Sequence, residues 1–134
     1  MSKLLKIKIK SYKKNSGLLI PLNFNKNFPI SVKRIFFIYG KKNMTRGNHA
    51  HKRCSQFFYS VSGNFLLNVQ TSNMKKKIII KHNSKVGILV PPMYWVSVKI
   101  LNKNSSLMVV CDQLYNSNDY ITNFNEYKKY LRKK

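Results

Sequence analysis

The sequence has very few acidic residues. Three Asp and Glu stand against 26 Lys and Arg, so the formal net charge is +23. A field of that sign attracts phosphate groups at long range, which would suit a polyanion partner. Lys outnumbers Arg by 22 to 4, however, and the charges are spread over the whole chain. Nucleic-acid readers rely on Arg for forked contacts, and no recognition helix or nucleic-acid motif is present. Nucleic acid is therefore the less favoured partner.

Cysteines and long apolar runs are also scarce. Cys54 and Cys111 are the two cysteines, too few and too far apart for a disulfide framework or a zinc site. No apolar run approaches the ~18 residues of a membrane span. The N-terminus alternates charged with apolar side chains, unlike the unbroken apolar core of a signal peptide. These absences predict a soluble cytoplasmic protein with no membrane partner.

What the sequence does contain is a series of short β-prone runs. Val, Ile, Phe and Tyr fill Val32–Tyr39, and a turn at Gly63 joins Gln56–Val61 to Phe65–Gln70 as a hairpin. About eight to ten such runs, separated by turn residues, follow one another along the chain. A chain of 134 residues, 43% of them hydrophobic, can bury a proper core. We expect residues 1–134 to form a single all-β domain, a sandwich or barrel.

The C-terminal segment departs from this rhythm. Asn123 and Glu126 have the spacing of a helix capping box. Phe124, Tyr127 and Leu131 fall on one helical stripe. The pattern predicts a short terminal helix that lies on the barrel.

The motif with the most chemical content is Arg46–Lys52, which reads RGNHAHK. Two of the three histidines, His49 and His51, lie here two residues apart. On an extended strand this spacing puts both imidazoles on one face. Such a pair can act as a metal pincer or as an acid/base pair aimed at one bound molecule. Two polar residues on a solvated strand are the plainer alternative.

A small β barrel with such a pair pointing inward suggests the cupin fold, in which histidine pairs often hold a metal. A cupin metal site commonly adds a carboxylate shortly after the second histidine and a further histidine from a later strand. Here Gln56 and Val96 stand at those positions, and His82 lies in a polar turn. Two histidines without a carboxylate make a poor site for a catalytic divalent metal. The sequence therefore predicts a metal-free site with no cofactor.

Two imidazoles without a metal can still run proton chemistry. A neutral imidazole can take a proton and return it near physiological pH. Removal of a proton next to a carbonyl leaves an enolate, whose oxygen needs hydrogen-bond donors. The second histidine, Tyr39 or Arg46 can provide them. This inventory favours an isomerase that moves one proton between adjacent carbons.

Four segments together resemble a known family, the nucleotide-sugar 3,4-ketoisomerases. The segments are Lys33–Ile38, Arg46–Lys52, Val90–Pro92 with Trp95, and Asp119–Ile121, in that order along the whole chain. The family has the cupin fold, here a small jelly-roll β-barrel with a short C-terminal helix. It acts on dTDP-4-keto-6-deoxyglucose in pathways to 3-amino-3,6-dideoxy sugars of surface glycans.

The resemblance implies a metal-independent conversion of a 4-keto to a 3-keto sugar through an enediol(ate). His51 would remove the C3 proton, and His49 would assist at the oxygens. Arg46 and Arg34 are the candidates for the diphosphate, because a guanidinium forks onto phosphate oxygens. Trp95 would stack on the base or sugar, with core packing as the alternative.

The sequence departs from the family where Phe36 and Phe37 replace its usual tyrosine, and Tyr39 is the candidate replacement. The resemblance also implies a homodimer in which N-terminal strands, within Lys6–Leu22, are exchanged between subunits. Two other classes of function remain open. One is a non-catalytic cupin that binds a nucleotide sugar. The other is a basic nucleic-acid-binding barrel with the aromatic run 57–59 as its stacking residues.

Overall fold

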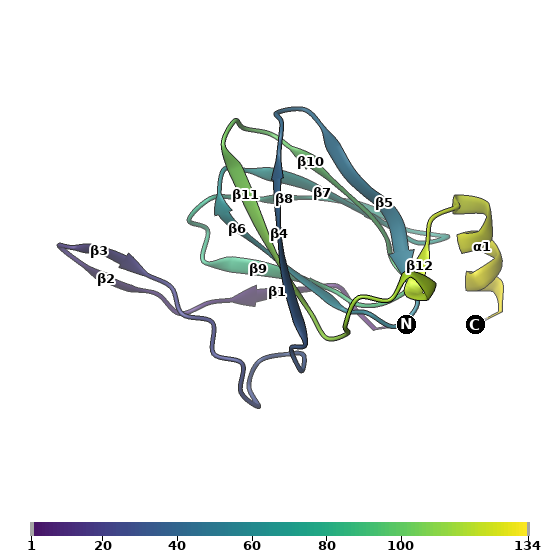
Figure 1. Cartoon of the computed structure of the whole chain (residues 1–134), viewed down its shortest axis with the longest axis horizontal. Coiled ribbons are helices and arrows are strands. Elements are labelled where there is room, and N and C mark those ends of the chain that lie inside the picture. Colours follow the sequence, from purple (N-terminus) through teal and green to yellow (C-terminus); the bar gives the residue numbers. More distant parts are fainter. Residues whose placement is uncertain (1, 134) are drawn as a thin grey trace.

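Two five-stranded antiparallel sheets roll into a barrel in the computed structural model, which describes residues 2–133 (Figure 1). The first sheet has the order β1(Leu5–Lys8), β9(Val86–Val90), β6(Gln56–Ser62), β11(Ser105–Cys111), β4(Arg34–Gly40). The second has the order β12(Tyr120–Ile121), β5(Thr45–His51), β10(Trp95–Ile100), β7(Phe65–Gln70), β8(Lys75–Ile80). The predicted all-β, cupin-type jelly-roll architecture is confirmed.

The core forms because these strands alternate apolar with polar side chains. In β7, Phe65, Leu67 and Val69 are buried, and the intervening residues face outward. A period of two puts every second side chain on the same face of the sheet. In β4 the inward residues are Phe36 and Ile38, which pack against the main core cluster. The barrel interior is thus built from the alternation that is visible in the sequence.

The aromatic run of β6 is buried on both faces of its sheet: Phe58 lies in the main core cluster, and Phe57 and Tyr59 lie in a second cluster that N-terminal residues cover. Phe57, Phe58 and Tyr59 are all buried. Their rings are therefore not available to stack on nucleic-acid bases, which removes the residues on which the nucleic-acid alternative depended.

The helix α1(Phe124–Arg132) lies on the outside of the barrel, against β5, β12 and the start of β10, as predicted (Figure 1). The Asn123 side chain caps it by accepting a hydrogen bond from the backbone N–H of Glu126 at 3.1 Å. Tyr127 is buried, and its hydroxyl lies 2.8 Å from the carbonyl oxygen of Met93 and 3.0 Å from that of Gln70. These contacts anchor the helix to the ends of β7 and β10. None of the helices within residues 2–133 is both long and apolar enough to span a membrane.

The N-terminal strands divide into two parts. β1 pairs with β9 of its own sheet, whereas β2(Tyr12–Lys14) and β3(Gly17–Leu19) form a hairpin that projects from the barrel (Figure 1). Tyr12, Leu18 and Leu19 on this hairpin are exposed.

Candidate active site

The last residues of β5 carry the two histidines. His49 and His51 lie in ring-to-ring contact, with centroids 5.0 Å apart. Ala50 between them is fully buried on the other side, in the cluster beneath α1. The predicted placement of both imidazoles on one face of the strand is confirmed.

A β-bulge before His49 sets the direction of this strand. His49 pairs with Val96 and Gly47 with Ser97, so Asn48 is the extra residue. Gly47 and Asn48 both have positive φ, +96° and +64°. A Cβ on Gly47 would lie 3.0 Å from the backbone oxygen of Val96, so a glycine fits here best. Bulges beside functional sites re-aim side chains, which explains the Gly-Asn step of the motif.

His51 is held by a carboxylate from far along the chain. Its Nδ1 lies 2.9 Å from Oδ2 of Asp119, at a separation of 68 residues. The backbone N–H of Arg53 donates to the other carboxylate oxygen at 2.7 Å, and that of Lys52 donates to the Asp119 carbonyl at 2.8 Å. Because a carboxylate only accepts hydrogen bonds, Nδ1 carries the ring proton. The lone pair of the neutral imidazole is therefore at Nε2.

That Nε2 atom is buried and has no hydrogen-bond partner among residues 2–133. The His51 side chain is only 4% exposed. Burial lowers the pKa of His51, although the hydrogen bond that its ring donates to Asp119 acts in the opposite direction. Burial and the nearby His51 lower the pKa of His49 to about 4. Both imidazoles are therefore neutral near pH 7.

Tyr120 completes the cluster from β12. It lies opposite His51 in the strand pairing, and its ring centroid is 4.4 Å from that of His51 and 4.9 Å from that of His49. Neither Tyr120 nor Asp119 was among the site residues predicted from the sequence. A signal for both did exist, because Asp119–Ile121 is one of the four segments that carry the family resemblance, and Asp119 is one of only three acidic residues.

A cavity of about 460 Å³ inside the barrel opens onto this cluster. Its lining includes His49, Tyr120 and Arg46. Gln56 and Val96 also line it, so the two positions compared with a cupin metal site do face the interior. A neutral base, a phenol and a guanidinium around one cavity can bind an anionic molecule and move one of its protons.

Of the other predicted residues, Arg34 lies close to the cluster. Its Nη2 donates to Sγ of Cys111 at 3.7 Å, its guanidinium carbon lies 5.6 Å from the Tyr115 ring centroid, and Tyr120 is beside it. Cys111 and Tyr120 raise the pKa of Arg34 against the opposing effect of burial, which is the largest single influence.

Tyr39 and Trp95 lie further from the imidazoles. Tyr39 is 73% exposed, stacks on Phe37, and reaches the cavity at its rim. Trp95 packs against the rings of Phe124 and Tyr127, at centroid distances of 5.1 and 5.5 Å. The indole therefore belongs to the contact between β10 and α1, in line with the core-packing alternative.

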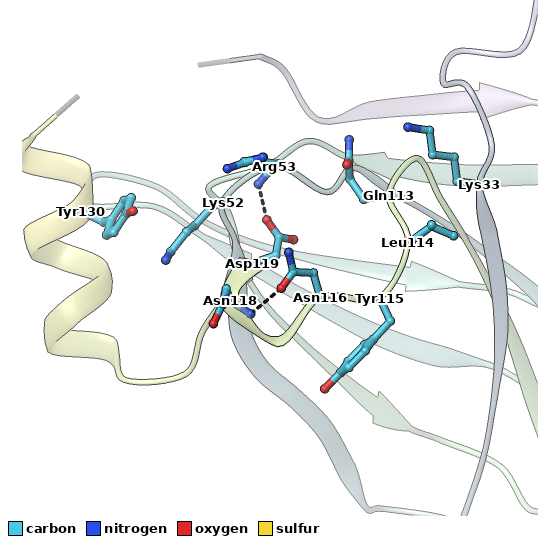
Figure 2. Close-up of a pocket in the computed structure, with 10 residues that line it drawn as sticks. All are labelled: Lys33, Lys52, Arg53, Gln113, Leu114, Tyr115, Asn116, Asn118, Asp119 and Tyr130. Carbon is cyan, nitrogen blue, oxygen red and sulfur yellow. Dashed lines mark hydrogen bonds between the residues drawn. The ribbon is translucent and has the colours of Figure 1, made fainter.

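A second, outer cavity of about 580 Å³ has Asp119 among its lining residues (Figure 2). Figure 2 shows Asp119 in its wall, joined to the Arg53 amide, with Lys52 and Lys33 among the lining residues. We take the inner cavity as the candidate active site, because its lining includes His49 and Tyr120. Asp119 both lines the outer cavity and contacts His51.

The structure also brings together donors that the sequence does not place side by side. One ring nitrogen of His51, Sγ of Cys54 and a carboxylate oxygen of Asp119 lie within 4.8 Å of one another. The prediction of a metal-free site assumed that no carboxylate accompanies the histidines. That assumption is wrong, because Asp119 reaches His51 from a different strand.

Comparisons with known proteins agree with this geometry. Residues 2–132 match the family model FdtA, described as WxcM-like, C-terminal. A TDP-4-oxo-6-deoxy-alpha-D-glucose-3,4-oxoisomerase from Aneurinibacillus thermoaerophilus is 30% identical over 130 residues, which cover 94% of this chain and 93% of the relative.

Solved structures show the same likeness. QdtA, a sugar 3,4-ketoisomerase from Thermoanaerobacterium thermosaccharolyticum in complex with TDP, has a TM-score of 0.91 and 26% identity, over 97% of this chain and 95% of that one. A 3,4-ketoisomerase from Helicobacter canadensis has a TM-score of 0.91 and 26% identity, over 98% and 99% of the two chains. The prediction of a cupin-fold sugar 3,4-ketoisomerase is confirmed, and the chain belongs to the FdtA family of WxcM-like proteins.

Proposed function

We propose that this protein converts TDP-4-keto-6-deoxyglucose to its 3-keto isomer, with His51 as the base. The observation that carries the assignment of the base is the buried, unpartnered Nε2 of His51, whose Nδ1 is held by Asp119. The substrate is proposed from the relatives, one of which is named as the oxoisomerase of this sugar nucleotide and another of which is solved with TDP.

The reaction needs a carbon that can lose its hydrogen as a proton, and groups that take that proton and deliver one to the neighbouring carbon. The C3 hydrogen lies next to the C4 carbonyl, so its loss as a proton gives an enediolate in which O4 carries the charge. Nε2 of His51 takes that proton. Delivery of a proton to C4 and transfer of the O3 hydroxyl proton to O4 then give the 3-ketone and a C4 hydroxyl, with no net change in atoms or charge.

Asp119 is proposed as a positioning residue. A carboxylate on Nδ1 holds the imidazole in the tautomer with a lone pair at Nε2, and it stabilises the imidazolium that forms when the proton is taken. The backbone N–H of Arg53 and the backbone contact with Lys52 hold the Asp119 side chain and main chain in place. The orientation of His51 is thus fixed before the substrate binds.

The remaining groups are assigned to the oxygens and the phosphates. Neutral His49 lines the cavity and can donate a hydrogen bond to the enediolate. Two phenols can assist, Tyr120 from within the cluster and Tyr39 from the rim. Arg46 in the cavity wall and Arg34 beside Tyr120 are proposed to bind the diphosphate.

We further propose that two chains form a homodimer by exchange of N-terminal residues. β1 is paired within its own chain, so the exchanged part would be the projecting hairpin β2–β3. Its exposed Tyr12, Leu18 and Leu19 are apolar surface that a partner would cover. Light scattering of the intact chain and of a variant with Leu18 and Leu19 replaced by Ser tests this, because the variant should be monomeric.

The function itself is tested by supplying TDP-4-keto-6-deoxyglucose and following the sugar by NMR. The proposal expects a 3-keto product that is absent without protein. A protein that binds the sugar nucleotide in calorimetry but leaves it unchanged would instead be a non-catalytic binder, the alternative left open by the sequence.

A further inference from the structure

A thiol lies beside the proposed base and has no part in the proposed reaction. Cys54 follows His51 in the loop between β5 and β6, and Asp119 comes from the 3-10 turn Ser117–Asp119 before β12. One donor atom from each lies within 4.8 Å of the other two. Isomerisation uses the imidazole and the carboxylate, whereas it has no use for the sulfur.

We propose that His51, Cys54 and Asp119 form a binding site for zinc, and that zinc bound there blocks the isomerase. The blocking part of this inference rests on the proposed function, in which His51 is the base. The metal-binding part stands on the donor atoms alone.

The donor set fits zinc in chemistry and in size. Imidazole nitrogen, thiolate sulfur and carboxylate oxygen are the three ligand types that zinc takes in proteins. Mg²⁺ and Ca²⁺ prefer oxygen ligands, so the sulfur selects against them. Around tetrahedral zinc, with bonds of about 2.0–2.3 Å, ligand atoms lie about 3.3–3.8 Å apart. The widest pair of donors here must close by about 1 Å at most to reach that range, whereas Nδ1 of His51 and Oδ2 of Asp119 are already 2.9 Å apart.

The donors are also incompletely used by the fold. Nε2 of His51 is buried without a partner among the described residues. The Cys54 thiol donates a long hydrogen bond, 3.4 Å, to the carbonyl of the adjacent Ser55, and its other neighbour is the thiol of Cys111. Both residues are at least nine-tenths buried, so these are interior donors rather than surface groups. Buried polar atoms without partners are uncommon in folded proteins, and a ligand is one explanation for them.

An ion can reach the site through the outer cavity, because Asp119 lies in its wall (Figure 2). Binding would release the thiol proton of Cys54 to solvent. The metal would take either the lone pair at Nε2 or the place of the proton at Nδ1. In both cases the imidazole can no longer accept a proton from the sugar, so catalysis stops.

The charge of the chain acts against this binding. Lys33, Lys52 and Arg53 line the outer cavity and repel a divalent cation. Salt screens such repulsion beyond a distance of about 8 Å at physiological ionic strength. Zinc binding should therefore strengthen as salt is added. An ion attracted only by surface charges of the opposite sign would instead bind more weakly in salt.

The experiment uses Co²⁺ as a spectroscopic probe and Zn²⁺ as a competitor and inhibitor, on the intact chain. Cys54→Ser removes the thiol in the cluster, and Cys111→Ser is the matched control because it alters the other buried thiol. We expect the wild type and Cys111→Ser to show a thiolate-to-cobalt absorption band that zinc abolishes. At zinc about ten times its Kd, activity should fall roughly tenfold by mass action. Cys54→Ser should keep its basal activity and lose both the band and the sensitivity to zinc.

Three outcomes would overturn the proposal in distinguishable ways. A wild type without a thiolate band at saturating cobalt has no such site, whatever its activity. A band without loss of activity shows that the metal leaves His51 free, which refutes the block and leaves the isomerase assignment intact. Zinc inhibition that persists in Cys54→Ser places the inhibitory metal elsewhere.

Discussion

Asp119 and His51 are 68 residues apart in sequence, and their side chains meet at 2.9 Å inside the fold. The contact forms because β12 pairs with the end of β5, which brings Tyr120 opposite His51. Asp119 immediately precedes Tyr120 in the chain, so the same pairing brings its carboxylate to His51. The same pairing therefore supplies the carboxylate that holds the imidazole and the phenol that lies against it.

The first prediction concerns this carboxylate. Asp119→Asn keeps the shape of the side chain but allows the wrong tautomer of His51, so kcat should fall by about two to four powers of ten with little change in KM. Steady-state kinetics on the sugar nucleotide measures both. Asp112→Asn is the matched control, because Asp112 accepts a hydrogen bond from the backbone of Ser55 at 2.8 Å. That variant should lose about 1 kcal/mol of stability and retain its kcat.

The second prediction separates the two phenols. Tyr120 contacts both imidazole rings, whereas Tyr39 lies mostly in solvent at the rim. Tyr120→Phe should lower kcat by about 10²-fold, the usual effect of a proton donor, and Tyr39→Phe should change it little. The opposite ranking would show that the rim tyrosine, the one suggested by the sequence, is the working phenol.

The third prediction concerns the bulge that aims His49. Gly47→Ala forces a side chain into a positive-φ position 3.0 Å from a backbone oxygen, which should cost about 1–3 kcal/mol. Urea unfolding measures the loss. Gly17→Ala is the control, since Gly17 also has positive φ but has nothing within 4 Å of its added Cβ. If both variants lose the same stability, backbone conformation alone explains the effect and the crowding against β10 contributes nothing.

The fourth prediction uses the buried phenol beneath the helix. Burial raises the pKa of Tyr127 to about 12, above the value of about 10 of an unfolded chain. The native state thus holds this proton more tightly, and the resulting stability is complete below about pH 10 and is lost as pH rises toward 12.

Tyr127→Phe removes that proton and leaves the carbonyls of Met93 and Gln70 without their donor. The variant should be less stable by about 1–3 kcal/mol near neutral pH. The deficit should shrink in strongly alkaline solution, because only the wild type carries the Tyr127 phenol whose contribution is lost there. Denaturant unfolding at several pH values gives both curves, and a constant deficit would contradict the assignment.

Much of the architecture was predictable, because it follows from local patterns. The period-two alternation indicates the strands, Gly63 indicates a hairpin, and Asn123 caps α1 as its spacing suggests. The pair His49 and His51 was recognisable for the same reason, since their common face depends only on the strand period.

The rest of the site depends on contacts between distant segments. No local pattern indicates that Asp119 reaches His51, or that the two-residue strand β12 forms at all. The direction of Trp95 is set by α1, whose position on the barrel is a tertiary property. Asn48 at positive φ is likewise imposed by the pairing of β5 with β10 rather than by its neighbours in sequence.

The most direct test of the central claim is the exchange of sugar hydrogen with solvent during turnover in deuterated water. Wild-type protein given TDP-4-keto-6-deoxyglucose should form the 3-keto sugar with deuterium at C4. His51→Asn should lower conversion and exchange together by about two or more powers of ten, while circular dichroism shows an intact fold. If His51→Asn converts the sugar and incorporates deuterium at the wild-type rate, His51 is not the base and the account is wrong.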